Sequence, residues 1–359
     1  MAGGIEKQSI LLMNQLVDKG YRVGVVTWDS CKAEPHYFLD SRVTWYKLDL
    51  GSPFTRASSF LRFKRQIRIR KFVKDFSPDV SIAYQVGTFL AAKISMLGLN
   101  VPLIAAERNS PDLFDYVQNG KKLRQRAEFI LRFASAVTVQ FEEYFSKYPI
   151  FLHSKLVSIN NPVSMPDLSV FPNNHHPSPK RILSLGRLSF QKNQSFLISS
   201  FALIANDYPD WVLTLVGEGE KRAELEELVD QLSLHKQVEF IGASKQVELW
   251  FEQSSFLAFP SLWEGFPNAL AESLAYGLPA IGFNSTAGVN VLIDHNYNGL
   301  LVDNNEQAFA DGMVILINDC ELRIRLGANA IRSVDCYEPQ KVFKQWEELF
   351  CRLAANKSL

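Results

Sequence analysis

The chain has 359 residues, of which 47% are hydrophobic and 21% charged, with 38 basic residues balanced by 38 acidic ones. This length favours two domains of about 150–180 residues, and the balanced charge gives no indication of a nucleic-acid partner. The four cysteines lack Cys-x-x-Cys spacing, which argues against a disulfide framework and a structural zinc site and suits a reducing cytoplasm. No apolar run approaches the roughly 18 residues of a membrane span, and no signal-peptide pattern opens the chain. We therefore expect any contact with a membrane to be at its surface.

Short apolar, β-branched stretches alternate with longer helical patterns in both halves of the chain. The strands predicted in the first half are 22–27, 43–48, 80–84, 103–106, 136–140 and 156–159. Those predicted in the second half are 182–185, 212–216, 238–241, 256–259 and 280–283. Alternation of this kind is typical of parallel sheets with helices on both faces, so we predict an α/β fold with two Rossmann-like, doubly wound domains.

A proline-rich stretch without periodicity, residues 161–180, lies between the two halves and is interpreted as the interdomain connection. The predicted organisation is a first domain over 1–162, a linker over 163–180, a second domain over 181–338 and a C-terminal helical segment over 339–359.

The first domain opens with Gly3 and Gly4, just before a helix predicted from about residue 6 to residue 17. Glycines there let the backbone approach a phosphate, and the helix end supplies a favourable field. A tight turn without a ligand explains the pair equally well.

The segment 56–74 contains eight basic residues and no acidic one. Drawn as a helix, its outward face carries Phe60, Phe63, Ile67, Lys64, Arg70, Lys71 and Lys74. Apolar groups among cations are typical of a surface that binds an anionic membrane. The alternative is a solvated helix face with a few exposed apolar residues.

In the second half, the strand 182–185 is followed by Gly186, Arg187 and, a few residues later, Lys192. Ligands of open α/β sheets bind outside the carboxyl ends of strands, where these cations are expected to point to the solvent. There they can neutralise a diphosphate and the charge that develops as it leaves a sugar. A pair of ordinary surface cations is the alternative.

Two further turns follow predicted strands of the second half. Strand 212–216 runs into Gly217-Glu218-Gly219-Glu220, but Arg222 occupies the position of the third glycine of a dinucleotide fingerprint, which excludes a nicotinamide site there. Strand 238–241 ends at Gly242.

Two glutamates, Glu264 and Glu272, lie on either side of a turn in the segment 260–279. The turn itself is formed by Gly265, Phe266, Pro267 and Asn268. Asn268 can cap a helix predicted to begin at Ala269, so that backbone N–H groups face a ligand. Anions and hydroxyls bind at such helix ends, and we interpret the segment as a site for a sugar nucleotide. The alternative is a capped helix with two solvated glutamates.

The Glu-x₇-Glu spacing followed by Gly-Leu-Pro, together with Leu-Gly-Arg-Leu and Gln-Lys-Asn, resembles retaining glycosyltransferases of the GT-B fold, in particular glycosyltransferase family 4. The resemblance implies that Arg187 and Lys192 hold the diphosphate, with Glu264 at the donor sugar and Glu272 at the ribose hydroxyls. It also implies that the turn with Glu218 lines the nucleotide pocket and that the main chain at Gly242 binds the base. In this family a hydrophobic strand precedes the Gly-Gly loop. That strand is missing here, for which we expect a start site assigned late or a shortened chain. The alternative is a real absence, which would lower the stability of the first domain.

Relatives of this kind often carry a histidine after the strand equivalent to 103–106, but here Arg108 and Asn109 are the candidate cleft residues. No Asp-x-Asp occurs in the chain, and we expect neither a required metal nor a cofactor.

The function implied is metal-independent transfer of a hexose, with retention, from a UDP- or GDP-sugar to a glycan acceptor. We expect a polyprenyl- or lipid-linked acceptor in the biosynthesis of lipopolysaccharide, O-antigen or capsule. The expected location is the cytoplasm, peripheral on the inner face of the plasma membrane. A sugar-nucleotide epimerase of the same architecture and a non-catalytic binding subunit remain alternatives.

Overall fold

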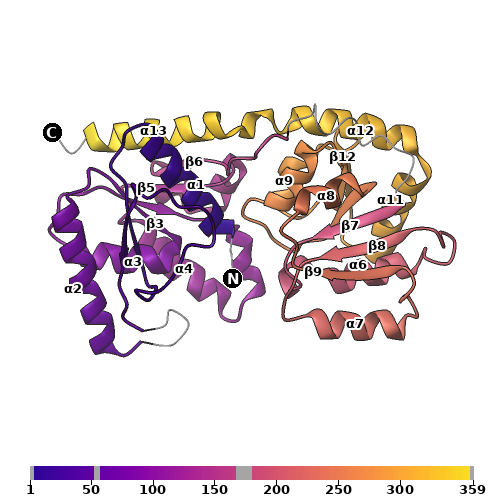
Figure 1. The fold of residues 1–359 in the computed structure, drawn as a ribbon, viewed down its shortest axis with the longest axis horizontal. Coiled ribbons are helices and arrows are strands. Elements are labelled where there is room, and N and C mark those ends of the chain that lie inside the picture. The colour runs from indigo at the N-terminus through magenta and orange to yellow at the C-terminus, as the bar shows by residue number, and fades with distance from the viewer. Residues whose placement is uncertain (1–3, 52–56, 167–179, 356–359) are drawn as a thin grey trace. The chain divides into compact units, whose positions relative to one another are not determined.

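The computed structural model describes residues 4–51, 57–166 and 180–355. The chain forms two compact units, which are described separately below. Unit 1 comprises Met1–Pro162 and Gln340–Leu359, and unit 2 comprises Val163–Pro339. All the strand ladders in both units are parallel and helices cover the sheets (Figure 1), so the predicted α/β fold with two Rossmann-like units is confirmed.

Unit 1 contains two separate parallel sheets. The smaller sheet pairs β1 (Gly24–Thr27) with β2 (Thr44–Lys47). The larger has the order β3 (Ser81–Tyr84), β4 (Leu103–Ala106), β5 (Ala136–Val139) and β6 (Leu156–Ser158). The described chain opens with a helix, and β1 and β3 each pair along one side only. In the described residues no strand lies between β1 and β3, so the two sheets are separate.

Helices cover both sheets of unit 1. They are α1 (Gly4–Asp18), α2 (Ser59–Phe76), α3 (Gln85–Ser95), α4 (Gly120–Leu131), α5 (Ile150–His153) and α13 (Pro339–Ala355), with short 3₁₀ turns at η1 (Pro111–Tyr116) and η2 (Glu142–Lys147). Helix α2 packs on the smaller sheet, where Phe72 stacks on Tyr46 of β2. Helix α13 comes from the far end of the chain, yet its Val342 and Trp346 share one buried cluster with Leu12 of α1 and Ile104 of β4. Burial of this apolar stripe holds α13 on unit 1.

Helix α2 buries Ile69 and Val73, and its opposite face exposes Phe60, Phe63 and Ile67. Arg70 departs from the predicted outward face. Its Nη1 donates hydrogen bonds to the carbonyl oxygens of Ser95 and Leu97, at 3.0 and 2.6 Å, so it closes the C-terminal end of α3. Unsatisfied carbonyls at a helix end attract such a cation, which is why the placement of Arg70 was wrong. Arg56, the first residue of the basic segment, lies outside the described residues.

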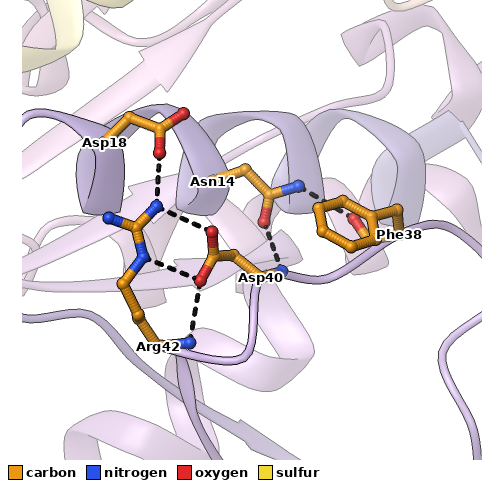
Figure 2. Close-up of polar contacts among 5 residues, drawn as sticks. All are labelled: Asn14, Asp18, Phe38, Asp40 and Arg42. Atoms are coloured by element: carbon orange, nitrogen blue, oxygen red, sulfur yellow. Dashed lines mark hydrogen bonds and ion pairs between the residues drawn. The ribbon is translucent and has the colours of Figure 1, made fainter.

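The long connection between β1 and β2 is fastened to α1 by polar contacts that Figure 2 shows. Asn14 of α1 donates to the carbonyl oxygen of Phe38 at 2.8 Å and accepts from the backbone N–H of Asp40 at 2.9 Å. Arg42 binds the carboxylate of Asp40 through two nitrogens and also pairs with Asp18. The Arg42 guanidinium lowers the pKa of Asp40 to about 2. A connection of 16 residues without regular structure is thereby held at a defined place.

Unit 2 has one continuous sheet of six strands, in the order β12-β11-β10-β7-β8-β9. The strands are β7 (Arg181–Leu185), β8 (Val212–Val216), β9 (Val238–Gly242), β10 (Phe256–Phe259), β11 (Ala280–Phe283) and β12 (Gly299–Val302). Strand β12 was not predicted. Its position beside β11 depends on Gly299, where a β-carbon would lie 2.4 Å from the carbonyl oxygen of Ala280.

Helices again cover both faces of this sheet. They are α6 (Gln194–Ala202), α7 (Arg222–Gln231), α8 (Val247–Glu252), α9 (Asn268–Ala275), α10 (Val289–Leu292), α11 (Glu306–Asn318) and α12 (Cys320–Ser333), with 3₁₀ turns η3 (Phe190–Lys192) and η4 (Asp335–Tyr337). Helices α6, α7, α11 and α12 meet the sheet in one large buried cluster that includes Phe201, Phe256 and Phe309. Among the described residues, no helix is both long enough and apolar enough to cross a bilayer.

Candidate functional site

The middle of the unit 2 sheet is a topological switch point. Strands β8 and β9 follow on one side of β7, whereas β10, β11 and β12 lie on its other side. Connections leave β7 and β10 to opposite sides of such a point, which opens a crevice at their carboxyl ends. The loop after β7 carries Arg187 and Lys192, and the loop after β10 carries Glu264.

These two loops are joined to each other by a row of contacts. The backbone N–H of Leu262 donates to the carbonyl oxygen of Gln191 at 2.9 Å, and Gln191 Nε2 donates to the carbonyl oxygen of Trp263 at 2.8 Å. The rings of Phe190 and Trp263 pack with their centroids 6.1 Å apart. Gln191, Phe190 and Trp263 were not predicted as site residues, although Gln191 belongs to the Gln-Lys-Asn motif. Their contacts fix the relative position of the charged side chains beside them.

Lys192 and Glu264 form an ion pair across the two loops. The distance from Lys192 Nζ to Glu264 Oε1 is 2.5 Å, and their side chains are 20% and 7% exposed. The prediction that Lys192 points to the solvent was wrong, because the loop after β10 folds over it. A pair this enclosed is held by its mutual attraction, and removing one member takes away the ion-pair partner of the other.

Arg187, in contrast, points to the solvent as predicted. Its guanidinium lies 3.0 Å from the carboxylate of Glu220, and both side chains are more than half exposed. An exposed pair of this kind is weak and exchanges readily with another anion. Arg187 can therefore exchange Glu220 for a phosphate at a small cost in free energy. Lys192, in contrast, is held in a fixed position by Glu264.

The glycine-rich turn after β8 lies against the backbone of the β7 loop. A β-carbon on Gly217 would lie 1.9 Å from the carbonyl oxygen of Gly186, and one on Gly219 would lie 2.1 Å from that of Leu188. The two glycines are thus required for packing between strand ends. Arg222 binds the carboxylates of Glu218 and Glu226, which gives it a structural partner set rather than a place in a dinucleotide loop.

The third strand end of this edge is at Gly242. Its carbonyl oxygen accepts from the N–H of Gly217 at 2.8 Å, and its φ is +83°. A β-carbon here would meet Glu218 Oε1 at 2.8 Å. The turns with Arg187, Glu218 and Gly242 therefore lie side by side, as their sequence positions predicted.

The segment from Glu264 to Pro267 is buried. The ring of Phe266 packs edge-on against that of Tyr337, with the ring centroids 5.4 Å apart. Helix α9 begins at Asn268 itself, with Pro267 at the capping position, so the prediction that Asn268 caps a helix starting at Ala269 was wrong. Proline is tolerated at this position because the N–H that it lacks would have no partner within the helix. Glu272 lies one turn inside α9 and is partly buried.

The candidate residues of unit 1 are placed at two different elements. Gly4 is the first residue of α1, and Gly3 lies outside the described residues. Arg108 and Asn109 follow β4 at its carboxyl end, and both are partly buried. In the part of the chain that the structure describes, no three His, Cys, Asp or Glu residues gather closely enough to hold a metal ion.

Comparison with known proteins gives the same assignment. The family model "Glycosyl transferases group 1" matches residues 167–333. An uncharacterised glycosyltransferase of Haemophilus influenzae is 28% identical over 356 residues, covering 96% of both chains. A Campylobacter jejuni α-1,4-N-acetyl-D-galactosaminyltransferase, named for a GalNAc-GalNAc-diNAcBac-PP-undecaprenol acceptor, is 26% identical and covers 98% of this chain and 96% of its own.

Solved structures show the fold. The sucrose-phosphate synthase of Thermosynechococcus elongatus superposes with a TM-score of 0.83 at 19% identity, covering 99% of this chain and 94% of that one. HepE of Anabaena, in complex with UDP and glucose, gives 0.75 at 18% identity, covering 97% and 96%. The motifs at the switch point, the family match and the fold agree. The chain therefore belongs to the group 1 glycosyltransferases, glycosyltransferase family 4, a family of retaining enzymes with the GT-B fold.

Proposed function

We propose that the protein transfers a sugar from a nucleotide-diphosphate sugar to a lipid-linked glycan during assembly of a surface polysaccharide such as lipopolysaccharide, O-antigen or capsule. The observation that carries the donor half of this proposal is the enclosed Lys192–Glu264 pair at the switch point of unit 2. The acceptor half is supported by the undecaprenyl-diphosphate acceptor named for the Campylobacter relative.

In this proposal the donor diphosphate lies at the carboxyl ends of β7 and β8. Arg187 leaves Glu220 to bind it, and Lys192 adds a second positive charge from its fixed position. As the bond between sugar and diphosphate breaks, negative charge grows on the departing oxygen, so these cations stabilise the transition state more than the ground state.

Glu264 is proposed to orient the donor sugar, and Glu272 to accept hydrogen bonds from the ribose hydroxyls. The base is proposed to bind the main chain at Gly242, beside Glu218. No enclosed nucleophile is assigned, and the departing phosphate is proposed to take the acceptor's proton on the same face of the sugar. This front-face route preserves the configuration at the anomeric carbon.

The exposed face of α2 is proposed to dock on the anionic inner face of the plasma membrane, from the cytoplasmic side. Phe60, Phe63 and Ile67 are each more than half exposed, and Lys64, Lys71 and Lys74 lie exposed among or beyond them. The Lys64 ammonium sits 4.5 Å from the centre of the Phe60 ring. Aromatic and aliphatic side chains interleaved with lysines suit a headgroup layer over an apolar interior.

The test is a transfer assay with UDP- and GDP-sugars and isoprenyl-diphosphate-linked saccharides as acceptors. We expect nucleoside diphosphate to be released only when donor and acceptor are both present. An epimerase of this fold would instead convert the sugar nucleotide without any acceptor. A binding subunit would protect against unfolding with the donor, by about 2.7 kcal/mol at one hundred times its Kd, but release nothing.

A further inference from the structure

Unit 1 holds an arginine, Arg108, that forms no ion pair with a carboxylate of the described residues. The Arg108 guanidinium follows β4, is partly buried, and lies 5.3 Å from the centre of the Trp346 ring of α13. Its Nη1 donates to the carbonyl oxygen of Ile159 at 3.2 Å and lies 3.5 Å from Asn161 Oδ1. Within residues 4–51, 57–166 and 180–355, no aspartate or glutamate forms an ion pair with it.

The hydrogen bonds of Arg108 use only one end of the guanidinium. Both leave from Nη1, while Nε and Nη2 have no partner among the described residues. Nε–H and Nη2–H point in parallel from one edge of the planar group, in the geometry that binds two oxygens of a phosphate or carboxylate. The edge suited to an oxyanion is the edge that the protein leaves unused.

An isolated charge at a partly buried position is costly, and arginine does not escape by losing its proton. Burial lowers the pKa of Arg108, but an arginine stays charged at neutral pH. The adjacent Glu107 attracts Arg108 through space but forms no ion pair with it, and burial favours the neutral form of the Glu107 carboxyl. One carboxylate interaction of Glu107 is with the backbone N–H of Val86 at the start of α3, and its Oε1 has no hydrogen-bond partner. A bound anion would supply the missing countercharge.

The surroundings of Arg108 are those of a ligand site rather than of a core. β4 is an inner strand of its sheet, and polar residues follow β5 and β6 at the same edge. Gln140, after β5, is fully buried, with Nε2 donating to the carbonyl oxygen of Glu107 at 3.0 Å and Oε1 without a partner. Carboxyl ends of parallel strands are where ligands of such sheets bind.

We propose that Arg108 binds a phosphate group at the carboxyl edge of the unit 1 sheet, through Nε and Nη2. This site lies in a different unit from Arg187 and Lys192. It rests on the proposed function for its ligand, a diphosphate, which can come from the lipid-linked acceptor or from the nucleotide donor. Arg108 is then a specificity residue that recognises the diphosphate attached to the donor sugar or to the acceptor glycan.

Calorimetric titration of the full chain with farnesyl diphosphate and, separately, with UDP tests the site. We expect Arg108→Gln to weaken farnesyl diphosphate binding at least tenfold and leave UDP binding unchanged, and Arg187→Ala to do the reverse. Loss of UDP binding in Arg108→Gln would assign the same site to the donor diphosphate. Wild-type affinity for both ligands in a folded Arg108→Gln protein would overturn the proposal.

Arg108→Lys is the control for a purely structural effect. It keeps a positive charge near Trp346 but lacks the parallel Nε–H and Nη2–H donors. We expect it to fold with a thermal midpoint near the wild type and to bind farnesyl diphosphate less tightly than the wild type. If Arg108→Lys binds farnesyl diphosphate as tightly as the wild type does, Nε–H and Nη2–H do not bind the phosphate and the proposal fails. This result would not contradict the proposed glycosyltransferase function. That function is tested separately, by the release of nucleoside diphosphate from the wild-type enzyme in the presence of an acceptor.

Discussion

The two units have related architectures but differ in how their sheets and sites are built. Unit 2 has one unbroken sheet, and the loops at its centre are joined by backbone hydrogen bonds and an enclosed ion pair. Unit 1 has two separate sheets, and the Arg108 guanidinium at its strand ends forms no ion pair with a described residue. Within the part of the chain that the structure describes, each unit has a buried side-chain oxygen without a hydrogen-bond partner, Ser261 Oγ in unit 2 and Gln140 Oε1 in unit 1, so the difference lies in the charges. A site whose charges are already paired is preorganised, whereas a charge without an ion pair depends on what it binds. We infer that unit 2 is set for its ligand in advance and that unit 1 is completed by its ligand.

The largest effect that separates an enclosed from an exposed cation is expected at the β7 loop of unit 2. Lys192→Ala and Arg187→Ala should each lower turnover by roughly 10²–10³, because each removes a charge that stabilises the leaving group. Only Lys192→Ala should also lower the free energy of unfolding, by about 3 kcal/mol, since it removes the ion-pair partner of the buried Glu264 carboxylate. Initial rates and urea unfolding of the two variants measure this. Equal stability of both would contradict the preorganised pair.

The next effect concerns a carboxyl group in unit 1. Burial raises the pKa of Glu107 to about 7 from 4.5, so the folded protein binds more protons than the unfolded chain between these values. Its contribution to stability is therefore full below about pH 4.5 and is lost as the pH rises through 7, for a total of about 3 kcal/mol. Glu107→Gln should remove this dependence and be the more stable protein at pH 8. The measurement is the free energy of unfolding of both proteins at several values from pH 5 to pH 8. If the two free energies change with pH in the same way, the pKa of Glu107 is not raised and the prediction is wrong.

Membrane binding should distinguish the surfaces of the two units. Changing Lys64, Lys71 and Lys74 of α2 to Gln should abolish sedimentation with anionic vesicles, because each cation contributes about 1 kcal/mol within a Debye length of about 10 Å at 0.1 M salt. Turnover on a short soluble acceptor should be unaffected. The matched control changes three exposed lysines of unit 2, Lys180, Lys236 and Lys245. Loss of vesicle binding in both triple variants would show that the vesicles attract the positive charge of the whole protein, and that α2 is not a specific membrane-binding face.

A smaller effect is expected on nucleotide affinity. Glu272→Ala should weaken binding of free nucleoside diphosphate by about tenfold, in keeping with the loss of a hydrogen bond to a charged acceptor. Glu264→Gln serves as the comparison and should reduce transfer sharply while retaining that affinity. Calorimetry of both variants decides the division of roles, which is wrong if Glu264 governs free-nucleotide affinity and Glu272 only turnover.

Much of this molecule could be predicted from its sequence, and the errors have local causes. Alternating strand and helix patterns gave the fold class, and glycine turns after strands marked the edge where Arg187, Glu218 and Gly242 lie together. The ion pair between Lys192 and Glu264 could not be predicted, because it joins loops 72 residues apart in sequence. Arg70 was misplaced for a similar reason, since its partners are carbonyls of another helix. Periodicity identifies elements, but contacts between distant loops depend on tertiary packing.

Hydrogen exchange measured by mass spectrometry, with and without saturating nucleoside diphosphate, tests the central claim most directly. The claim is that the nucleotide binds the preorganised switch point of unit 2, so backbone amides there should exchange more slowly when it is bound. We predict protection in residues 186–193, 217–222 and 262–272, with the strand ends of unit 1 unchanged. Protection confined to unit 1, or none in the three segments of unit 2 at a concentration that saturates binding, would contradict the account.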